Sequence, residues 1–280
     1  MNVALTGASG FIGRHVVAVL KRRSISPIAV LRPSSEVPTH LSDLRIARID
    51  IASPPENSFD VMGRPNSLIH LAWSGLPNYQ SSHHVDVELP AQVGFLKRLV
   101  KSGLRNLVVT GTCLEYGMVS GCLDEKMEPR PENPYGLAKD TLRRRLEELQ
   151  NEDGFSLTWA RLFYLFGDGQ AENSLIPQLE RAIERGDPVF NMSGGKQLRD
   201  YLPVEVAADQ LVSLSQTGCS NGIVNICSGK PISVRRLVEN YVAEKGCDIK
   251  LNPGYYPYPD FEPMEFWGDG RHYHELVGER

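Results

Sequence analysis

The feature that most constrains the fold is a glycine-spaced stretch near the start of the chain, TGASGFIG, at residues 6–13. It directly follows an apolar run and opens a segment with helical spacing, which is the context that gives such a pattern weight. Gly7 permits a tight turn, Gly10 lets the backbone approach a pyrophosphate, and Gly13 lets helix and strand pack closely. The start of the helix also offers free N–H groups to phosphate. The stretch therefore predicts a strand–turn–helix unit that binds a dinucleotide.

The first half of the chain alternates short apolar runs with helical patterns. The runs predicted to be strands are NVALTG, SPIAVL, LRIARID, SLIHLAW and RNLVVTG, and SLTWARLFYLFG follows later. Nearly continuous apolar runs are typical of strands that are covered on both faces of a parallel sheet. Helices are expected from about Phe11, over about 87–101, and after Asn133. This alternation predicts an α/β fold with a Rossmann-type doubly wound parallel sheet.

The second half of the chain is less regular. Prolines and glycines become dense after Gly167, and YYPYPDFEP cannot form a helix, so we expect it to be an irregular wall. We predict that residues 1–165 and 201–228 form the dinucleotide-binding Rossmann domain. Residues 166–200 and 229–280 are then expected to form a smaller cap that binds the substrate.

The composition excludes several classes of protein. The chain has 280 residues and a formal net charge of −4, and it lacks the basic stripe that a nucleic-acid-binding protein would show. Its five cysteines are scattered and contain no CxxC pair, which predicts a reduced, cytoplasmic protein without a structural metal site. No apolar run is long enough to cross a bilayer. The start of the chain runs straight into the glycine motif, so we expect neither a signal peptide nor a membrane partner.

Two later stretches carry residues suited to catalysis. In NPYGLAK, Tyr135 and Lys139 lie four residues apart and share one face of a helix. A tyrosine hydroxyl, with a reference pKa of about 10, is a poor acid–base group at neutral pH, and a nearby cation lowers that pKa. In VVTGTCLEYG, the hydroxyl pair Thr110 and Thr112 stands where a buried strand ends. Together these stretches predict a proton-transfer site beside the bound dinucleotide.

These motifs together resemble the extended short-chain dehydrogenase/reductase superfamily, in particular its NAD(P)-dependent nucleotide-sugar epimerases, dehydratases and 4-ketoreductases. TGASGFIG, HLAW, GTCLEYG, NPYGLAK and LRDYLPVEVA occur in the family's order and cover nearly the whole chain. The resemblance implies hydride transfer at a carbon that bears oxygen. The family's strand-end hydroxyl lies four residues before the tyrosine of a Tyr-Gly pair, which here is Thr112. The implied catalytic set is Thr112 to orient the oxygen, Tyr135 to exchange its proton, and Lys139 to tune Tyr135 and hold the nicotinamide ribose.

The resemblance also suggests the cofactor. NAD-dependent members carry an acidic residue after the second strand, whereas this chain has Arg32 there. An arginine can form a fork with a 2′-phosphate, with Arg14 assisting, so we favour NADP and keep NAD as the alternative. Asp50 corresponds to the family position at the adenine edge. The predicted cofactor-binding residues are Gly7, Gly10, Phe11, Ile12, Gly13, Arg14, Arg32, Asp50, Ile51, Leu71, Ala72, Trp73, Tyr135, Lys139 and Leu162.

The implied substrate is a nucleotide-diphosphate sugar. Arg199 corresponds to the family's arginine that binds the diphosphate, Asn173 and Leu175 resemble the segment that contacts the nucleotide, and Phe190 is a candidate for stacking on the base. The predicted substrate-binding residues are Ser74, Thr112, Tyr164, Asn173, Leu175, Phe190 and Arg199.

The chain departs from the family in two places near the sugar. Tyr164 stands in RLFYLFG where many epimerases have asparagine, and the helix after HLAW begins HHVDVELP instead of with asparagines. The pocket is therefore not a standard galactose-epimerase pocket. We expect the adjacent His83 and His84 to lie on a solvated loop and not to reach the substrate.

The residues after Thr112 select among the family's reactions. A 4,6-dehydratase needs acid groups just after the strand-end hydroxyl, and this chain has Cys113 and Leu114 there. We expect Glu115 to be out of register and to point elsewhere. The favoured reaction is NADP-dependent reduction of a nucleotide-diphosphate 4-keto-6-deoxyhexose at C4. A 4-epimerase with tightly bound NAD is the alternative, and a 4,6-dehydratase or a non-catalytic NADP-sensing protein fits less well.

In the family, the helices that correspond to about 87–101 and 134–150 pair with their copies. The resemblance therefore implies a homodimer through these two helices. Leu142, Leu146 and Leu149 would serve that interface, but they would equally serve the core.

Overall fold

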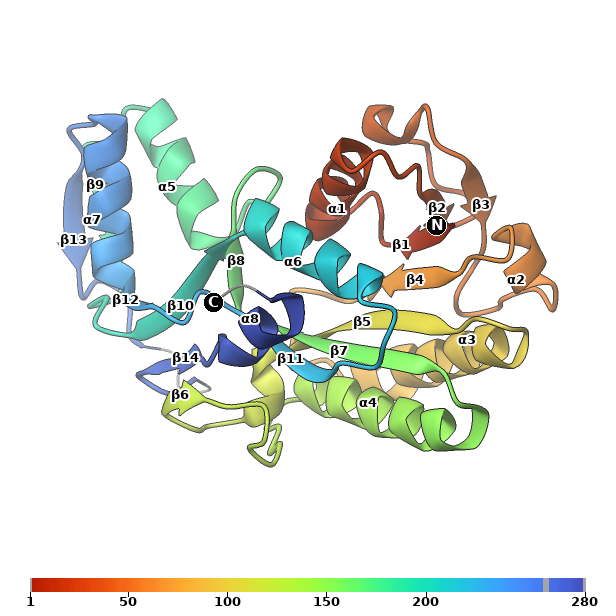
Figure 1. The fold of residues 1–280 in the computed structure, drawn as a ribbon. Coiled ribbons are helices and arrows are strands. Elements are labelled where there is room, and N and C mark those ends of the chain that lie inside the picture. The colour runs from red at the N-terminus through yellow and green to blue at the C-terminus, as the bar shows by residue number, and fades with distance from the viewer. Residues whose placement is uncertain (1, 259–261, 279–280) are drawn as a thin grey trace.

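A seven-stranded parallel sheet forms the centre of the molecule (Figure 1). The computed structural model describes residues 2–258 and 262–278. The strand order is β11-β7-β5-β4-β1-β2-β3. These strands are β1 (Val3–Thr6), β2 (Ile28–Leu31), β3 (Ile46–Arg48), β4 (Ser67–His70), β5 (Asn106–Thr112), β7 (Ser156–Leu162) and β11 (Gly222–Ile226). The chain winds outward from β1 in one direction and from β4 in the other, so the predicted doubly wound α/β fold is confirmed.

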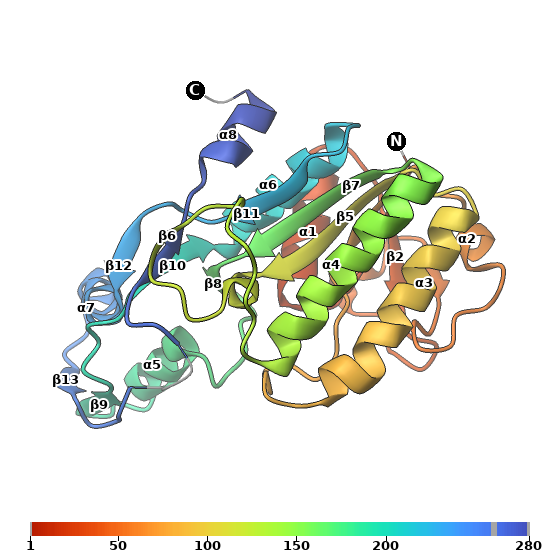
Figure 2. The ribbon, with the colours of Figure 1, turned by 90° about the horizontal axis from the view of Figure 1, so that it is seen from below.

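Helices cover both faces of this sheet. Side chains of α1 (Phe11–Arg22) and α6 (Val204–Gln216) share one apolar core with the sheet. Those of α2 (Ser58–Val61), α3 (Leu89–Lys101) and α4 (Pro134–Asp153) share the other. Figure 2 shows α3 and α4 lying side by side along their face. Both strand faces are therefore buried, which explains why most residues of these strands are apolar.

The ends of α4 follow from its sequence, and they matter because α4 carries Tyr135. Asn133 caps the helix by accepting the Gly136 N–H on its Oδ1 at 2.8 Å, and Pro134 fills the first helical position, where no N–H is needed. Gly154 ends the helix in the left-handed conformation, with φ +61°.

The stretch SLTWARLFYLFG forms two strands, so the prediction of a single strand was wrong. β7 ends at Leu162, and the Phe163 N–H donates to the Ile226 carbonyl at 3.1 Å. After this residue the chain leaves the main sheet and continues as β8 (Tyr164–Phe166). β8 lies in a separate three-stranded sheet with β10 (Leu198–Pro203) and β12 (Pro231–Ser233).

The smaller half of the molecule has a core of its own. Side chains from α5 (Leu175–Glu184), α7 (Val234–Lys245) and the strand pair β9 (Val189–Met192) and β13 (Lys250–Pro253) form it. β14 (Phe266–Gly268) pairs with β6 (Gly121–Leu123), and α8 (Arg271–Val277) follows. Short helical turns occupy η1 (Thr39–Leu41), η2 (His84–Glu88) and η3 (Cys113–Tyr116). Residues 259–261 of the predicted irregular wall lie outside the described residues. Within the described ranges, no helix is both long and apolar enough to span a membrane.

Candidate active site

The glycine turn and the end of β4 meet at the carboxyl edge of the sheet. Gly7 has φ +70°, and a Cβ on it would lie 3.0 Å from the Ala72 nitrogen. Thr6 Oγ1 accepts the N–H groups of Leu71 and Ala72 at 3.1 and 3.3 Å. A Cβ on Gly13 would lie 2.0 Å from the Gly7 carbonyl oxygen. Both positions therefore require glycine for a close backbone approach, as the motif predicts.

The start of α1 has the features that a dinucleotide phosphate needs. Gly10 precedes the helix and makes no side-chain hydrogen bond to it, so the N–H groups of Phe11 and Ile12 are not covered by a capping side chain. The Arg14 Nε is buried without a hydrogen-bond partner among the described residues. Arg14 Nη1 lies 3.5 Å from Asp168 Oδ2. Uncapped amides and an unpaired guanidinium nitrogen fit an anionic group at this helix start.

The predicted adenosine side lies at the same sheet edge. Arg32 follows β2 and is exposed, and within the described residues its guanidinium makes no hydrogen bond or ion pair. Arg48 Nη1 donates to the Arg32 carbonyl at 3.0 Å and so fixes the backbone there. Asp50 follows β3 and is exposed, and Ile51 packs partly against the core. These residues could surround an adenosine ribose, with a free cation available to a phosphate on it.

Helix α4 brings the predicted catalytic pair against the end of β5. Lys139 Nζ donates to the Thr110 carbonyl at 2.9 Å. One turn earlier, the helix start touches the turn after β5, because a Cβ on Gly136 would lie 2.8 Å from the Leu114 oxygen. Tyr135, next to Gly136, is 8% exposed. The edge of the sheet and the helix therefore converge on Tyr135 and Lys139.

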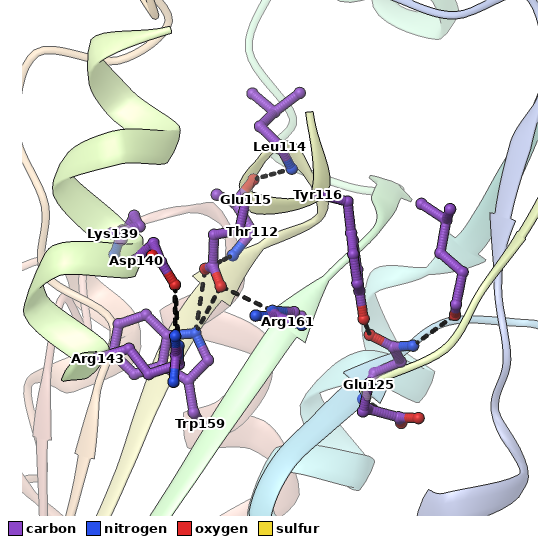
Figure 3. A network of polar contacts seen from close by, with 12 residues as sticks. Thr112, Leu114, Glu115, Tyr116, Glu125, Lys139, Asp140, Arg143, Trp159 and Arg161 are labelled. Atoms are coloured by element: carbon purple, nitrogen blue, oxygen red, sulfur yellow. Dashed lines mark hydrogen bonds and ion pairs between the residues drawn. The ribbon is translucent and has the colours of Figure 1, made fainter. Parts of the chain in front are cut away.

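Thr112 is the last residue of β5 and pairs in register with Leu162 at the end of β7. Its Oγ1 accepts the Leu114 N–H at 3.3 Å, and its own N–H donates to Glu115 Oε1 at 2.8 Å (Figure 3). Leu114 continues the turn, while the Glu115 side chain lies beneath it and is fully buried. Thr112, Tyr135 and Lys139 are thus brought to one site, and Glu115 points away from that edge.

Aromatic side chains enclose the predicted catalytic pair, Tyr135 and Lys139. Lys139 Nζ lies 4.0 Å from the centroid of the Trp73 ring, which is cation–π distance. The Tyr135 ring centroid lies 5.2 Å from His84, 5.5 Å from Tyr79 and 5.9 Å from Trp73. His84 is buried and accepts the Trp73 Nε1–H at 3.1 Å. The expectation that His84 is solvated was wrong, because the turn η2 directs its ring inward against Tyr135.

Burial sets the protonation of these two side chains. It raises the pKa of Tyr135 well above its ordinary value, and the nearby Tyr79 and Glu115 side chains add to this. Burial lowers the pKa of Lys139 to about 7. At neutral pH, Tyr135 is therefore a phenol that holds a proton to donate, as a general acid requires.

A buried polar network links the glycine turn to Ser74. His70 Nδ1 lies 2.9 Å from Thr6 Oγ1, and its Nε2 lies 2.8 Å from Gln92 Oε1. Gln92 Nε2 donates to Glu88 Oε2 at 3.0 Å, and the other Glu88 oxygen accepts the Ser74 hydroxyl. Burial lowers the pKa of His70 to about 3, so the ring is neutral. The sequence reasoning missed this network, although a histidine inside the apolar run SLIHLAW was a signal for it.

Two predicted substrate residues, Arg199 and Tyr164, both contact Glu262, which the sequence reasoning did not identify. Arg199 is 2% exposed, and its Nη2 lies 3.0 Å from Glu262 Oε2. Tyr164 Oη donates to the other Glu262 oxygen at 2.7 Å. The Arg199 guanidinium also lies 4.6 Å from the centroid of the Phe266 ring. Arg199 is therefore held by a carboxylate that a ligand anion would have to replace or share.

The remaining predicted substrate residues lie apart from this group. Asn173 is exposed just before α5, and Leu175 begins that helix. Phe190 is buried in the core of the smaller half, with Leu179 and Val238, and is not displayed on the surface. Among the residues that the structure describes, no group of three or more His, Cys, Asp or Glu side chains is placed to hold a metal ion.

Comparison with known proteins matches this chain to one family. The model of the NAD dependent epimerase/dehydratase family matches residues 3–227. The chain is 31% identical over 272 residues to a dTDP-6-deoxy-L-talose 4-dehydrogenase (NAD(+)) of Aggregatibacter actinomycetemcomitans, with 96% of this chain and 99% of that protein covered. It is 25% identical to a dTDP-4-dehydro-6-deoxyglucose reductase of Escherichia coli, covering 90% and 82%. The solved structure of MoeE5 with UDP-glucuronic acid and NAD matches with a TM-score of 0.84 and 27% identity, covering 99% of this chain and 93% of that one.

Proposed function

We propose that this chain, which belongs to the NAD dependent epimerase/dehydratase family, reduces a nucleotide-diphosphate 4-keto-6-deoxyhexose at C4 and oxidises the C4 alcohol in the reverse direction. The observation that carries the proposal is the enclosed, protonated Tyr135 held with Lys139 at the end of β5. The similarity to the talose 4-dehydrogenase, which extends over 96% of the chain, supports the choice of C4. A bound nicotinamide cofactor would supply the hydride to C4.

The chain's own residues would supply the proton and the alignment. Tyr135 would donate its hydroxyl proton to the C4 oxygen as that oxygen gains charge. The Thr112 hydroxyl would hold the same oxygen in place. Lys139, fixed by the Thr110 carbonyl and the Trp73 ring, would hold the nicotinamide ribose and favour the phenolate that remains.

The finer choice among the family's reactions rests on the residues of the turn after β5, η3. A dehydratase would need an acid–base group at the substrate, but Leu114 is apolar and the Glu115 carboxylate is fully buried. A 4-epimerase with tightly bound NAD is the second candidate, because it would use the same three side chains and let the keto-sugar rotate between two hydride transfers. The two candidates differ in whether reduced cofactor is consumed.

We further propose that the cofactor is NADP. The support is the free guanidinium of Arg32, which follows β2 where an NAD enzyme carries a carboxylate. Arg32→Asp should weaken NADPH binding at least about tenfold more than NADH binding, since it removes a charge-assisted contact to the 2′-phosphate. Equal effects on the two cofactors in a fluorescence titration would refute this choice.

We propose that different parts of the chain bind the cofactor and the nucleotide sugar. Residues 1–165 and 201–228 would bind the cofactor, and 166–200 and 229–280 the nucleotide sugar. A homodimer would form through α3 and α4. Leu142, Leu146 and Leu149 are buried against the sheet, so exposed apolar residues near these helices, Val87 and Leu137, would serve the interface instead. Sedimentation of Leu137→Glu should then show a shift towards monomer.

One assay tests the reaction. Purified protein is mixed with NADPH or NADH and a dTDP-linked 4-keto-6-deoxyhexose, and the loss of reduced nicotinamide is followed by its absorbance. Tyr135→Phe should lower kcat by about 10²- to 10⁴-fold, the range for loss of a general acid, with unchanged circular dichroism. Interconversion of UDP-sugars without added cofactor, together with no consumption of NADPH or NADH, would favour the epimerase instead.

A further inference from the structure

A completely buried carboxylate lies directly under the catalytic turn. Glu115 is 0% exposed, and its two oxygens accept hydrogen bonds from three different groups (Figure 3). Oε1 accepts the Thr112 backbone N–H at 2.8 Å, and Oε2 accepts Arg161 Nε at 2.7 Å. Trp159 Nε1 lies 3.0 and 3.1 Å from the two oxygens. The carboxylate thus ties two residues of β7 to the end of β5.

The backbone of β5 is built around this contact. A Cβ on Gly111 would lie 2.2 Å from Trp159 Nε1 and 2.5 Å from Glu115 Oε1. No side chain fits at these distances, so the glycine between the two threonines makes room for the carboxylate and the indole. The Thr-Gly-Thr stretch therefore allows the carboxylate and the indole to pack against the strand, and it also supplies two hydroxyl groups.

Stability alone does not account for an ion pair at this place. Burying two charges costs about as much as their attraction returns, and an apolar pair of similar volume often gives a more stable protein. Arg161 is also imperfectly paired, because its Nη1 and Nη2 have no hydrogen-bond partner among the described residues. Its guanidinium lies instead 4.4 Å from the centroid of the Tyr116 ring.

Glu115 is too enclosed to contact the substrate, but it holds Thr112, which the proposed function places at the substrate oxygen. Both of its oxygens are occupied and enclosed, so it cannot exchange a proton at the sugar. Thr112 donates its N–H to Glu115 while its own Oγ1 accepts the Leu114 N–H. These two hydrogen bonds hold the Thr112 backbone in the extended conformation, at φ −147° and ψ 146°, and with it the position of the hydroxyl.

We propose that Glu115 is a positioning residue that acts through Thr112. Held by Trp159 and Arg161, it clamps the end of β5 so that the Thr112 hydroxyl stays aimed at the oxygen on the reacting carbon. The proposal rests on the proposed function, because it needs Thr112 to contact that oxygen. Glu115 itself contacts neither substrate nor cofactor.

A double-mutant cycle tests this role. Glu115→Gln keeps the shape of the side chain but removes the charge that Arg161 holds, so the clamp on Thr112 loosens. It should lower kcat by about 10- to 100-fold, as expected when a catalytic group is misplaced by a fraction of an ångström, with KM changed less than about threefold. In the Thr112→Val background, which has no hydroxyl left to aim, the same change should lower kcat less than about threefold.

Glu125→Gln is the matched control. Glu125 is also a carboxylate that accepts a backbone N–H, that of Asn225, at 2.9 Å, but it is only partly buried. Asn225 in turn accepts the Tyr116 hydroxyl at 2.8 Å, so Glu125 lies at the far end of the same polar network (Figure 3). It does not contact Thr112, and its substitution should leave kcat unchanged.

A second variant covers the case in which Glu115→Gln does not fold. The pair Glu115→Met with Arg161→Met replaces the buried charges by apolar groups of similar size and should keep the melting temperature at or above that of the wild type. It should still lower kcat about 10- to 100-fold, because nothing then holds the Thr112 N–H. A folded pair variant with wild-type kcat would overturn the proposal.

The outcomes separate this inference from the proposed function. If Thr112→Val alone leaves turnover unchanged, the catalytic role of Thr112 fails and the inference fails with it. If Thr112→Val lowers kcat but Glu115→Gln has the same effect in both backgrounds, only the positioning role is refuted. The cycle can be read with either ketone reduction or epimerisation as the assay.

Discussion

Two arginine–glutamate ion pairs of the molecule differ in how far they are exposed to solvent. In the sealed pair, Arg161 on β7 and Glu115 are both 0% exposed. In the open pair, the side chain of Arg199 on β10 is 3% exposed but that of its partner Glu262 is 20% exposed. Nothing from solvent can replace Glu115, whereas an incoming anion can replace or share Glu262 without leaving a buried charge unpaired. The sealed pair therefore suits the fixing of a backbone, and the open pair suits ligand exchange.

The largest effect should come from breaking the sealed pair. Arg161→Met leaves the Glu115 carboxylate buried without its cation and should lower the free energy of unfolding by about 3–5 kcal/mol. Arg199→Met should cost less than about 2 kcal/mol, because the exposed side of Glu262 can be solvated. Urea denaturation at neutral pH measures both values. Equal losses would show that the two pairs do not differ in the way their exposure indicates.

Breaking the open pair should change the binding of the nucleotide sugar. If Arg199 takes the diphosphate of the nucleotide sugar, Arg199→Met removes charge-assisted hydrogen bonds worth about 1.5–3 kcal/mol, or about 10- to 100-fold in KM. The kcat and the affinity for the nicotinamide cofactor should change little. Arg236→Met, at an exposed arginine on α7, is the control. An unchanged KM in steady-state kinetics would remove Arg199 from the substrate site.

Most of the fold could be predicted from the sequence because its signals are local. The glycine turn, the apolar strands and the Asn133 cap each depend on neighbouring residues only. The split of β7 from β8 at Phe163 was missed, since it depends on a hydrogen bond to Ile226, which lies far away in the chain.

The candidate site divides in the same way. Tyr135 and Lys139 are four residues apart, so helix geometry alone places them together. The contacts of Glu115 span 44 and 46 residues, and that of Tyr164 with Glu262 spans 98. Such contacts depend on how the sheet and the smaller half pack, which a single sequence does not reveal. The same holds for the burial of His84 beside Tyr135.

Lys139 is buried like the sealed pair, and its burial should make the free energy of unfolding depend on pH. Its folded pKa of about 7 lies below the ordinary 10.5, so the unfolded chain binds more protons between these values. The stabilising contribution is therefore complete above about pH 10.5 and is lost as the pH falls to about 7. The free energy of unfolding of the wild type minus that of Lys139→Met should rise by about 1.4 kcal/mol per pH unit over this window.

Urea titrations without cofactor at several pH values measure this slope. Lys196→Met, which removes an exposed ammonium, should show no such difference from the wild type. A flat difference for Lys139→Met would mean that water reaches the ammonium group and that the surroundings of Lys139 are less enclosed than its contacts indicate.

The smallest expected effect comes from removing single hydrogen bonds. It compares a donor to Glu115 with a nearby donor that does not contact Glu115. Trp159→Phe removes one of three donors to Glu115, and Tyr116→Phe removes the hydrogen bond to Asn225. Each should lower the free energy of unfolding by about 0.5–1.5 kcal/mol. Only Trp159→Phe should also lower kcat, by about two- to fivefold on the scale of one hydrogen bond, because Tyr116 does not contact the carboxylate. If both variants lowered kcat alike, catalysis would depend on the rigidity of the whole region, and the sealed pair would have no special role in aiming Thr112.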